Sequence, residues 1–156
     1  MKLINFTDLT LGQKKMILEW RNHPDVRKWM YTDDEIALKD HVEFIESLNN
    51  RKDKVYFLLQ NETESIGVID FTDITKDSCE FGLYANPNLR AKGKIIMNEI
   101  IKYAFEVLKV SKLKAGALKD NEKAVFLYHS FNFQEIDKKI INEKAVICME
   151  LKNEKC

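Results

Sequence analysis

The sequence predicts a mixed α/β fold in which mostly antiparallel strands surround one crossover helix. In the middle and at the end of the chain, short apolar runs alternate with polar residues and are separated by turn residues, which is typical of paired strands. Between two of these runs, Lys94–Leu108 repeats apolar residues at helical spacing. A chain of 156 residues that is 45% hydrophobic can bury one core. We therefore expect residues 1–156 to form a single domain.

The first third of the chain predicts one strand followed by helices. The expected elements are a strand at Leu3–Phe6, a helix at Leu11–Trp20, short helical turns within 25–35, and a second helix from Ile36 to Leu48. Thr10 is well placed to cap the first helix. Pro24 ends that helix region, because the residue before a proline avoids helical geometry.

The rest of the chain changes to the two-residue period of strands. The expected elements are strands at Val55–Gln60, Ser65–Thr72, Cys79–Ala85 and Lys112–Leu118, helices at Lys94–Leu108 and Asn121–Ser130, and a final antiparallel pair at Phe133–Asp137 and Ala145–Leu151. In the third of these strands, Glu80, Gly82 and Tyr84 share one face, and Phe81 and Leu83 share the other. The last strand is apolar on both faces, which fits either burial inside the sheet or a contact in a homodimer.

Composition excludes several classes of function. Lys plus Arg (25) equals Asp plus Glu (25), so no global basic field is present to attract nucleic acid. No apolar run reaches the ~20 residues of a membrane span, and the N-terminus lacks the apolar stretch of a secretory signal. Cys79, Cys148 and Cys156 are odd in number and fit no metal motif, which suggests core or tail thiols in a reducing compartment. We expect a cytoplasmic protein without a metal.

A basic loop in front of a helix is the first candidate site. Residues 86–97 read as an Asn/Pro turn, a loop that holds Arg90, Lys92 and Lys94 around Gly93, and the start of an amphipathic helix. The first turn of a helix has unpaired N–H groups and partial positive charge. The segment therefore predicts a phosphate or pyrophosphate site. An ordinary strand-to-helix turn with solvated lysines is the alternative interpretation.

Two linked motifs carry a family resemblance. The first is Arg90-x-x-Gly93-x-Ile95, and the second is Asn121-x-x-Ala124-x-x-Leu127-Tyr128-x-x-x-Asn132-Phe133. Together they resemble the GCN5-related N-acetyltransferases (GNAT), which implies a splayed sheet flanked by helices on both faces and acetyl-CoA as cosubstrate. Ile95 stands where the family usually has Gly or Ala, so the phosphates would approach more tightly. Asn132 replaces a glycine, and asparagine tolerates the left-handed backbone expected there.

Five further segments narrow the resemblance. They are Trp20–Pro24, Trp29–Tyr31, Lys39–His41, Ile66–Asp70 and Glu80–Tyr84. They are similar to the branch of the family that acetylates the 4-amino group of a UDP-linked amino-dideoxy sugar in pseudaminic acid biosynthesis, a pathway that supplies flagellin glycans. The implied activity is that of an acetyl-CoA-dependent N-acetyltransferase.

The resemblance also implies the residues that would hold acetyl-CoA. They are Leu83, Tyr84, Ala85, Arg90, Lys92, Gly93, Lys94, Ile95, Asn121 and Tyr128. The backbone of Leu83–Ala85 would pair with the pantetheine arm like one more strand, and an N–H near Leu83 would polarise the thioester carbonyl. The loop Arg90–Ile95 would hold the pyrophosphate.

Tyr128 is the candidate acid for the departing thiolate. A phenol titrates near about 10 and a thiol near about 8.5, so a neutral tyrosine can donate a proton to a thiolate. Tyr128 also continues an apolar helix stripe with Ala124 and Phe131, and such a tyrosine can serve packing alone.

The acceptor side of the expected site comes from the first half of the chain. The residues implied are Arg21, Met30, Tyr31, His41, Phe44, Thr72 and Tyr84. Methionine and aromatic side chains suit the apolar faces of a dideoxy sugar, and arginine suits a diphosphate. His41 is the candidate base that takes the ammonium proton, with Glu80 or water as the alternatives.

Two other functions remain open from the sequence. One is an N-acetyltransferase that acts on a protein N-terminus or a small amine, which would need an open groove with an acidic lining. The other is a non-catalytic acyl-CoA-binding domain, which the unusual Ile95 keeps open.

Overall fold

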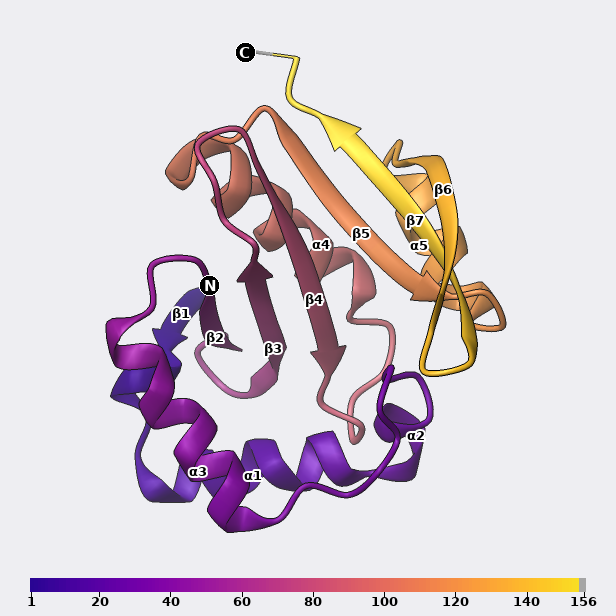
Figure 1. Cartoon of the computed structure of the whole chain (residues 1–156). Coiled ribbons are helices and arrows are strands. Elements are labelled where there is room, and N and C mark those ends of the chain that lie inside the picture. Colours follow the sequence, from indigo (N-terminus) through magenta and orange to yellow (C-terminus); the bar gives the residue numbers. More distant parts are fainter. Residues whose placement is uncertain (155–156) are drawn as a thin grey trace.

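The computed structural model describes residues 1–154, and Cys156 lies outside them. Within the described residues, seven strands form one sheet, in the order β1-β2-β3-β4-β5-β7-β6 (Figure 1). The strands are β1 (Lys2–Asn5), β2 (Val55–Gln60), β3 (Ser65–Thr72), β4 (Ser78–Ala85), β5 (Lys112–Leu118), β6 (Gln134–Ile141) and β7 (Lys144–Lys152). Every neighbouring pair is antiparallel except β4 and β5. The predicted mixed, mostly antiparallel fold is confirmed.

The helices follow the predicted order with small shifts at their ends. They are α1 (Leu11–Asn22), α2 (Pro24–Arg27), α3 (Leu38–Ser47), α4 (Gly93–Lys102) and α5 (Glu122–Ser130). Short helical turns occupy Phe6–Asp8 and Leu48–Asn50, and α4 continues into a wider π turn at Tyr103–Val107. Thr10 caps α1 in a reciprocal capping box with Gln13, as the sequence predicts.

The final hairpin is longer than predicted. Strand β6 runs to Ile141, whereas the sequence predicted an end at Asp137. It is the exposed edge of the sheet and carries Lys138 and Lys139 where an inner strand would carry apolar residues, so its second half lacks the apolar pattern of a strand. Strand β7 lies between β5 and β6. Its apolar character on both faces is therefore explained by its place inside the sheet.

Two hydrophobic clusters lie on opposite faces of the sheet. One joins α4 and α5 to odd-numbered strand residues such as Phe71 and Phe81. The other joins α1 and α3 to even-numbered residues such as Leu58 and Val68. Since neighbouring residues of a strand point to opposite faces, these two sets separate an α4/α5 face from an α1/α3 face. The expected helices on both faces are confirmed.

Strands β4 and β5 separate after a short paired stretch. Their parallel ladder joins only Ser78–Glu80 to Lys112–Lys114. Beyond it, β4 stays paired with β3 up to Ala85, and β5 stays paired with β7 up to Leu118. In Figure 1 the two arrows begin side by side and diverge toward their ends. The sheet is therefore splayed open at this point, as the resemblance implied.

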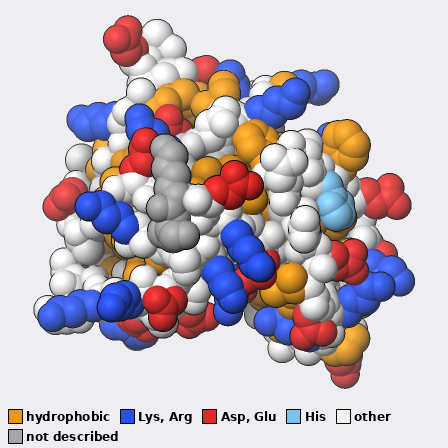
Figure 2. Space-filling model, turned by 90° about the horizontal axis from the view of Figure 1, so that it is seen from above, with side chains coloured by type: hydrophobic (Ala, Val, Ile, Leu, Met, Phe, Trp, Pro, Cys, Tyr) orange, Lys and Arg blue, Asp and Glu red, His pale blue; other side chains and the backbone are white. Residues whose placement is uncertain are grey.

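The surface carries charges of both signs. On the face seen in Figure 2, acidic and basic side chains are interspersed and apolar side chains lie between them. Within residues 1–154, no helix combines the length and the apolar character that crossing a bilayer requires.

The turn between β6 and β7 stores backbone strain. Asn142 and Glu143 have φ of 48° and 66°, and they connect the paired residues Ile141 and Lys144. Two consecutive positive φ values define a type I′ turn, whose second position favours glycine. Glu143 therefore occupies a left-handed position that costs a residue with a Cβ about 1–2 kcal/mol.

We expect Glu143→Gly to raise the free energy of unfolding by ~0.5–1 kcal/mol, because glycine adopts this backbone without a steric penalty. Urea denaturation measures the change. Glu62→Gly is the matched control, since Glu62 lies in a turn without a positive φ, and there glycine should lower stability through the entropy of the unfolded chain. A loss of stability in Glu143→Gly would contradict the assignment of strain to this turn.

Candidate active site

The open edge of β4 is the centre of the site. The N–H of Asn86 donates to the carbonyl of Ile66 at 2.9 Å, and the pairing of β3 with β4 continues in register from this bond. In an antiparallel pair, alternate residues bond to the partner strand, so Gly82 and Tyr84 direct their backbone groups to β3. Leu83 and Ala85 direct theirs away from β3, to the side from which β5 has separated.

This alternation corrects one detail of the predicted cosubstrate contacts. Leu83 and Ala85 offer open backbone groups, as expected, whereas the backbone groups of Tyr84 belong to the ladder with β3. The side chain of Tyr84 packs against the cluster beneath α1 and α3. Any contribution of Tyr84 to the site therefore comes from its ring and hydroxyl.

The beginning of α4 is unusually open to an anion. Its N-cap residue, Lys92, makes no capping bond with its side chain, and the first turn holds no acidic residue. By contrast, Thr10 caps α1 and Asn121 caps α5 by accepting from the N–H of Ala124 at 3.3 Å. The N–H groups of the first three residues, Gly93–Ile95, therefore point out of the helix end without a side-chain acceptor.

The side chains around this helix end are basic. Arg90 and Lys94 are exposed, whereas Lys92 reaches Glu64 at 3.5 Å. Gly93 sits tightly against α5, because a Cβ there would lie 3.0 Å from Cδ2 of Leu127. Ile95 is the third residue of α4, and its helical backbone leaves its N–H directed at the helix end.

Tyr128 packs in the core on the α4/α5 face of the sheet. Only 6% of the residue is exposed, and its ring meets Phe81 edge-on at 5.2 Å. Burial raises the pKa of its phenol above the ordinary value, and Tyr31 and Asp70 raise it further. Tyr128 is therefore neutral at physiological pH and holds a proton. It extends the apolar stripe of α5, as predicted, and it also stands within electrostatic reach of groups from β3 and the 31–33 segment.

Tyr31 reaches the opening from the opposite face. A Cβ added at Gly116 of β5 would overlap the Tyr31 hydroxyl, so the glycine leaves room for this ring. Burial raises the pKa of Tyr31 to about 12, and Glu80, Cys148 and Asp70 add to the shift. Beside Glu80 and Cys148, a groove of about 320 Å³ opens between β4, β5 and the final hairpin. Tyr31 in turn raises the pKa of Tyr128, which places the two side chains within electrostatic reach of each other where β4 and β5 diverge.

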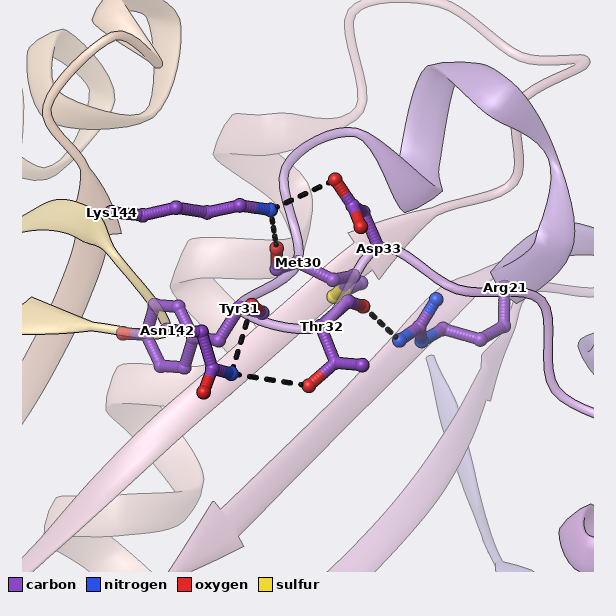
Figure 3. A network of polar contacts seen from close by, with 7 residues as sticks. All are labelled: Arg21, Met30, Tyr31, Thr32, Asp33, Asn142 and Lys144. Carbon is purple, nitrogen blue, oxygen red and sulfur yellow. Dashed lines mark hydrogen bonds and ion pairs between the residues drawn. The ribbon is translucent and has the colours of Figure 1, made fainter.

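The segment that carries Tyr31 is fastened at several points (Figure 3). Lys144 donates to the carbonyl of Met30 at 3.2 Å and to the Asp33 carboxylate at 3.1 Å. The side-chain amide of Asn142 donates to the carbonyl of Tyr31 at 3.1 Å. On the other side, Arg21 of α1 donates through Nη2 to the carbonyl of Thr32 at 3.1 Å. The β6–β7 hairpin and α1 thus hold residues 30–33 between them.

Arg21 has a donor that is not used within the described residues. Its Nη1 atom is buried and lacks a hydrogen-bond partner there. Burial lowers the pKa of Arg21, and the neighbouring Tyr84 opposes that shift. Because an arginine stays charged in proteins, this unpaired donor points to an acceptor that a ligand would supply.

The carboxylate of Asp70 lies among aromatic side chains on the α1/α3 face of the sheet. Asp70 of β3 stands opposite Tyr56 of β2 and Gly82 of β4. The Tyr56 ring meets Phe44 of α3 edge-on at 5.0 Å. Burial raises the pKa of Asp70 to about 7, and Glu80 adds to the shift, whereas Lys54 and the N–H of Gly82 oppose it. Thr72, two residues along β3, pairs with Glu80.

Sequence reasoning did not single out Tyr56 and Asp70 as site candidates. Asp70 belongs to a quoted segment, but the resemblance assigned it no function. One signal was available: Asp70 is the single charged residue in the apolar run Ile66–Phe71. A carboxylate at such a position needs compensation or a function.

His41 is placed between helices. Its residue is 6% exposed, and its Nε2 lies 2.9 Å from the carbonyl of Lys14, to which it donates. Burial lowers the pKa of His41, and the other groups that act on it come from Lys14. The described contacts therefore connect α3 to α1, and a catalytic or acceptor role for His41 stays a prediction. Among residues 1–154, no group of three or more His, Cys, Asp or Glu side chains could hold a metal ion.

Comparisons with known proteins agree with this geometry. The sequence model for the family described as "Acetyltransferase (GNAT) domain" matches residues 5–134. The chain is 51% identical over 136 residues to "Acetyltransferase PseH" of Campylobacter jejuni strain 81-176, which covers 87% of this chain and 86% of the relative.

Solved structures give the same result. The crystal structure of C. jejuni N-acetyltransferase PseH in complex with acetyl coenzyme A superposes with a TM-score of 0.82 at 42% identity, over 98% of this chain and 99% of the other. Spermidine N-acetyltransferase of Vibrio cholerae, at 19% identity and over 97% and 94% of the two chains, shares the fold with a TM-score of 0.85. The chain therefore belongs to the GNAT family of acetyltransferases.

Proposed function

We propose that this chain transfers an acetyl group from acetyl-CoA to the 4-amino group of a UDP-linked amino-dideoxy sugar. The observation that carries the proposal is the gap between β4 and β5. It joins an open strand edge on one side to a cluster of tyrosines and carboxylates on the other. An N-acetyltransferase needs this combination, because donor and acceptor must meet from opposite sides.

Two features support acetyl-CoA as the donor. The open backbone groups of Leu83 and Ala85 can pair with the amides of a pantetheine arm, as an added strand would. The uncapped start of α4, with Arg90 and Lys94 beside it, fits a pyrophosphate. The bound thioester supplies an acetyl group that a neutral amine can attack. The C. jejuni relative was solved with acetyl coenzyme A, which supports the same donor here.

The chain's own groups suit the chemistry of acetyl transfer. The N–H of Leu83 would donate to the thioester carbonyl oxygen, where negative charge develops. Tyr128, which keeps its proton at physiological pH, would donate that proton to the sulfur as the C–S bond breaks. Arg90 and the first N–H groups of α4, with Asn121 at the start of α5, would fix the donor's position.

The acceptor face suits a nucleotide sugar. Aromatic side chains and Met30 offer apolar surfaces for a dideoxy sugar, and the unpaired donor of Arg21 suits a phosphate oxygen or a hydroxyl. The relatives that share about half of the sequence carry the name "Acetyltransferase PseH". We place the reaction in pseudaminic acid biosynthesis for flagellin glycans, carried out in the cytoplasm by residues 1–156 as one domain. Formation of a homodimer stays a prediction.

Mass spectrometry tests this function directly. Incubation with acetyl-CoA and the UDP-linked 4-amino sugar should give the mono-acetylated UDP-sugar, with one CoA thiol released per product. Parallel incubations with an N-terminal peptide and with spermine separate the alternative acceptors. Acetylation of either one, with no sugar product at substrate-level enzyme, would overturn the sugar assignment.

We expect Arg90→Ala to weaken acetyl-CoA binding about tenfold, because a charge-assisted contact to phosphate contributes ~1.5 kcal/mol. Isothermal titration calorimetry at two salt concentrations measures the effect, which should shrink at the higher one. Arg51→Ala is the matched control, since Arg51 is an exposed arginine engaged with Asp53. Equal affinities for the two variants would show that the loop does not hold the phosphates.

We expect Tyr128→Phe to keep acetyl-CoA affinity and to lower kcat about 10²-fold or more, because only the proton donor is removed. Tyr103→Phe removes the hydroxyl of a tyrosine that stacks on Phe71 in the same hydrophobic cluster, and it should turn over normally. If Tyr128→Phe turned over like the wild type, its role would be packing alone.

A further inference from the structure

We propose that Asp70 is the general base that removes the proton from the acceptor's ammonium group. The inference rests on the proposed function. It names a residue to which the family resemblance assigns no catalytic role. It assigns the acid to the α4/α5 face of the sheet and the base to the α1/α3 face.

Position is the first argument. Asp70 pairs across the β3–β4 ladder with Gly82, the residue directly before Leu83. Leu83 directs its N–H to the open side of β4, where the thioester carbonyl would lie. The carboxylate of Asp70 is therefore one strand away from the reacting centre, on the face from which an acceptor would enter. The residue is half-buried, so it keeps access to a bound ligand.

Space around the carboxylate is the second argument. A Cβ added at Gly82 would lie 2.5 Å from Oδ2 of Asp70 and 3.0 Å from Oδ1. Any other residue at position 82 would displace the carboxylate. The glycine thus leaves the Asp70 side chain lying over β4, toward the divergence of β4 and β5. A carboxylate that served only the stability of β3 would not require this vacancy on the neighbouring strand.

Electrostatic surroundings are the third argument. Three neighbouring groups act on the carboxyl of Asp70: Glu80 and the Gly82 N–H on β4, and Lys54 before β2. Asp70 in turn raises the pKa of the tyrosines that surround it, which are Tyr31, Tyr56, Tyr84 and Tyr128. Burial and Glu80 raise the pKa of Asp70 to about 7. A base with a pKa near the working pH is both ionised and able to hold a proton.

The proton balance of the step is complete. The acceptor ammonium loses its first proton to Asp70, which leaves a neutral amine. The N–C bond forms and the C–S bond breaks. The second nitrogen proton replaces the one that Tyr128 gives to the sulfur, and Asp70 returns its proton to water. The products are the amide, the free CoA thiol and one released proton.

The other candidate bases have less suitable surroundings. The Nε2 atom of His41 is engaged with the carbonyl of Lys14 on α1. Glu80 lies on the paired part of β4, at the last rung of the ladder with β5. Of these three residues, Asp70 is the one that pairs with Gly82, directly before Leu83.

The decisive experiment compares pH profiles of kcat/KM for acetylation of the UDP-linked 4-amino sugar. Asp70→Asn should lower kcat about 10²-fold or more while acetyl-CoA affinity, measured by calorimetry, stays unchanged. Glu80→Gln removes a charge that raises the pKa of Asp70, so the acidic limb should move to lower pH. Lys54→Gln removes a charge that lowers this pKa, so the limb should move to higher pH. Asp77→Asn, an exposed aspartate of the loop before β4, is the control and should move nothing.

A second experiment tests whether Gly82 leaves the room that the Asp70 carboxylate needs. Gly82→Ala should lower kcat in the wild type by displacing the carboxylate, and it should cost little more in an Asp70→Ala background, where the obstacle is gone. Gly12→Ala is the control, because a Cβ there meets only Thr10 Oγ1 at 3.9 Å.

The outcomes separate the two proposals. If the wild type acetylates the sugar and Asp70→Asn does so at an equal rate, the base assignment fails and the function stands. The same holds if the acidic limbs of the pH profiles of Glu80→Gln and Lys54→Gln stay where the wild type has its limb. If the wild type binds acetyl-CoA but gives no sugar product, the proposed acceptor fails. Carbon-13 NMR titration of the Asp70 carboxyl then still decides the inference. A midpoint near neutral pH that falls in Glu80→Gln supports it, and a midpoint near pH 4 overturns it.

Discussion

The rest of the site depends on one interruption of hydrogen bonding, at which β4 leaves β5 after a ladder of three residue pairs. An open strand edge inside a sheet is costly, because its N–H and C=O groups need partners. Here β4 remains fixed by β3 on its other side and β5 remains fixed by β7, so the opening persists without loss of either strand. The unpaired groups of Leu83 and Ala85 are then held in place for a ligand that bonds like a strand. The crossover α4 begins just beyond this edge, which puts its free N–H groups near the same opening.

The opening also lets the two faces of the sheet act on each other. In a closed sheet, side chains from opposite faces are separated by the backbone layer. Between β4 and β5 that layer is missing. Tyr31 from one face raises the pKa of Tyr128 from the other, and Asp70 raises the pKa of both. Two glycines make room for this arrangement. Gly116 accommodates the Tyr31 hydroxyl, and Gly82 accommodates the Asp70 carboxylate. Neither glycine has a positive φ, so each is explained by space and not by backbone conformation.

The sequence predicted those parts of the fold that local patterns determine. Strands β2, β3 and β5 match their predicted ends, because alternation and flanking turn residues mark them clearly. The predicted strand Phe133–Asp137 ends four residues before the observed end of β6 at Ile141, because an exposed strand has no apolar alternation to recognise. The site was only partly predictable. Asp70 and Gly82 are 12 positions apart in the sequence, and they meet only through the register of the β3–β4 pair. The contact of His41 with the Lys14 carbonyl likewise depends on how α1 and α3 pack, which no local pattern reveals.

The β6–β7 hairpin connects the end of the chain to a segment near its beginning. The part of the chain that matches the family as a whole stops at residue 134, the first residue of β6. Asn142 and Lys144, which fasten the 30–33 segment, come after that boundary. The hairpin nevertheless belongs to the common fold, because the superpositions on the two solved acetyltransferases cover 98% and 97% of this chain. A substitution in the β6–β7 turn can therefore shift the segment that carries Tyr31 while the pairing of β4 with β3 stays intact.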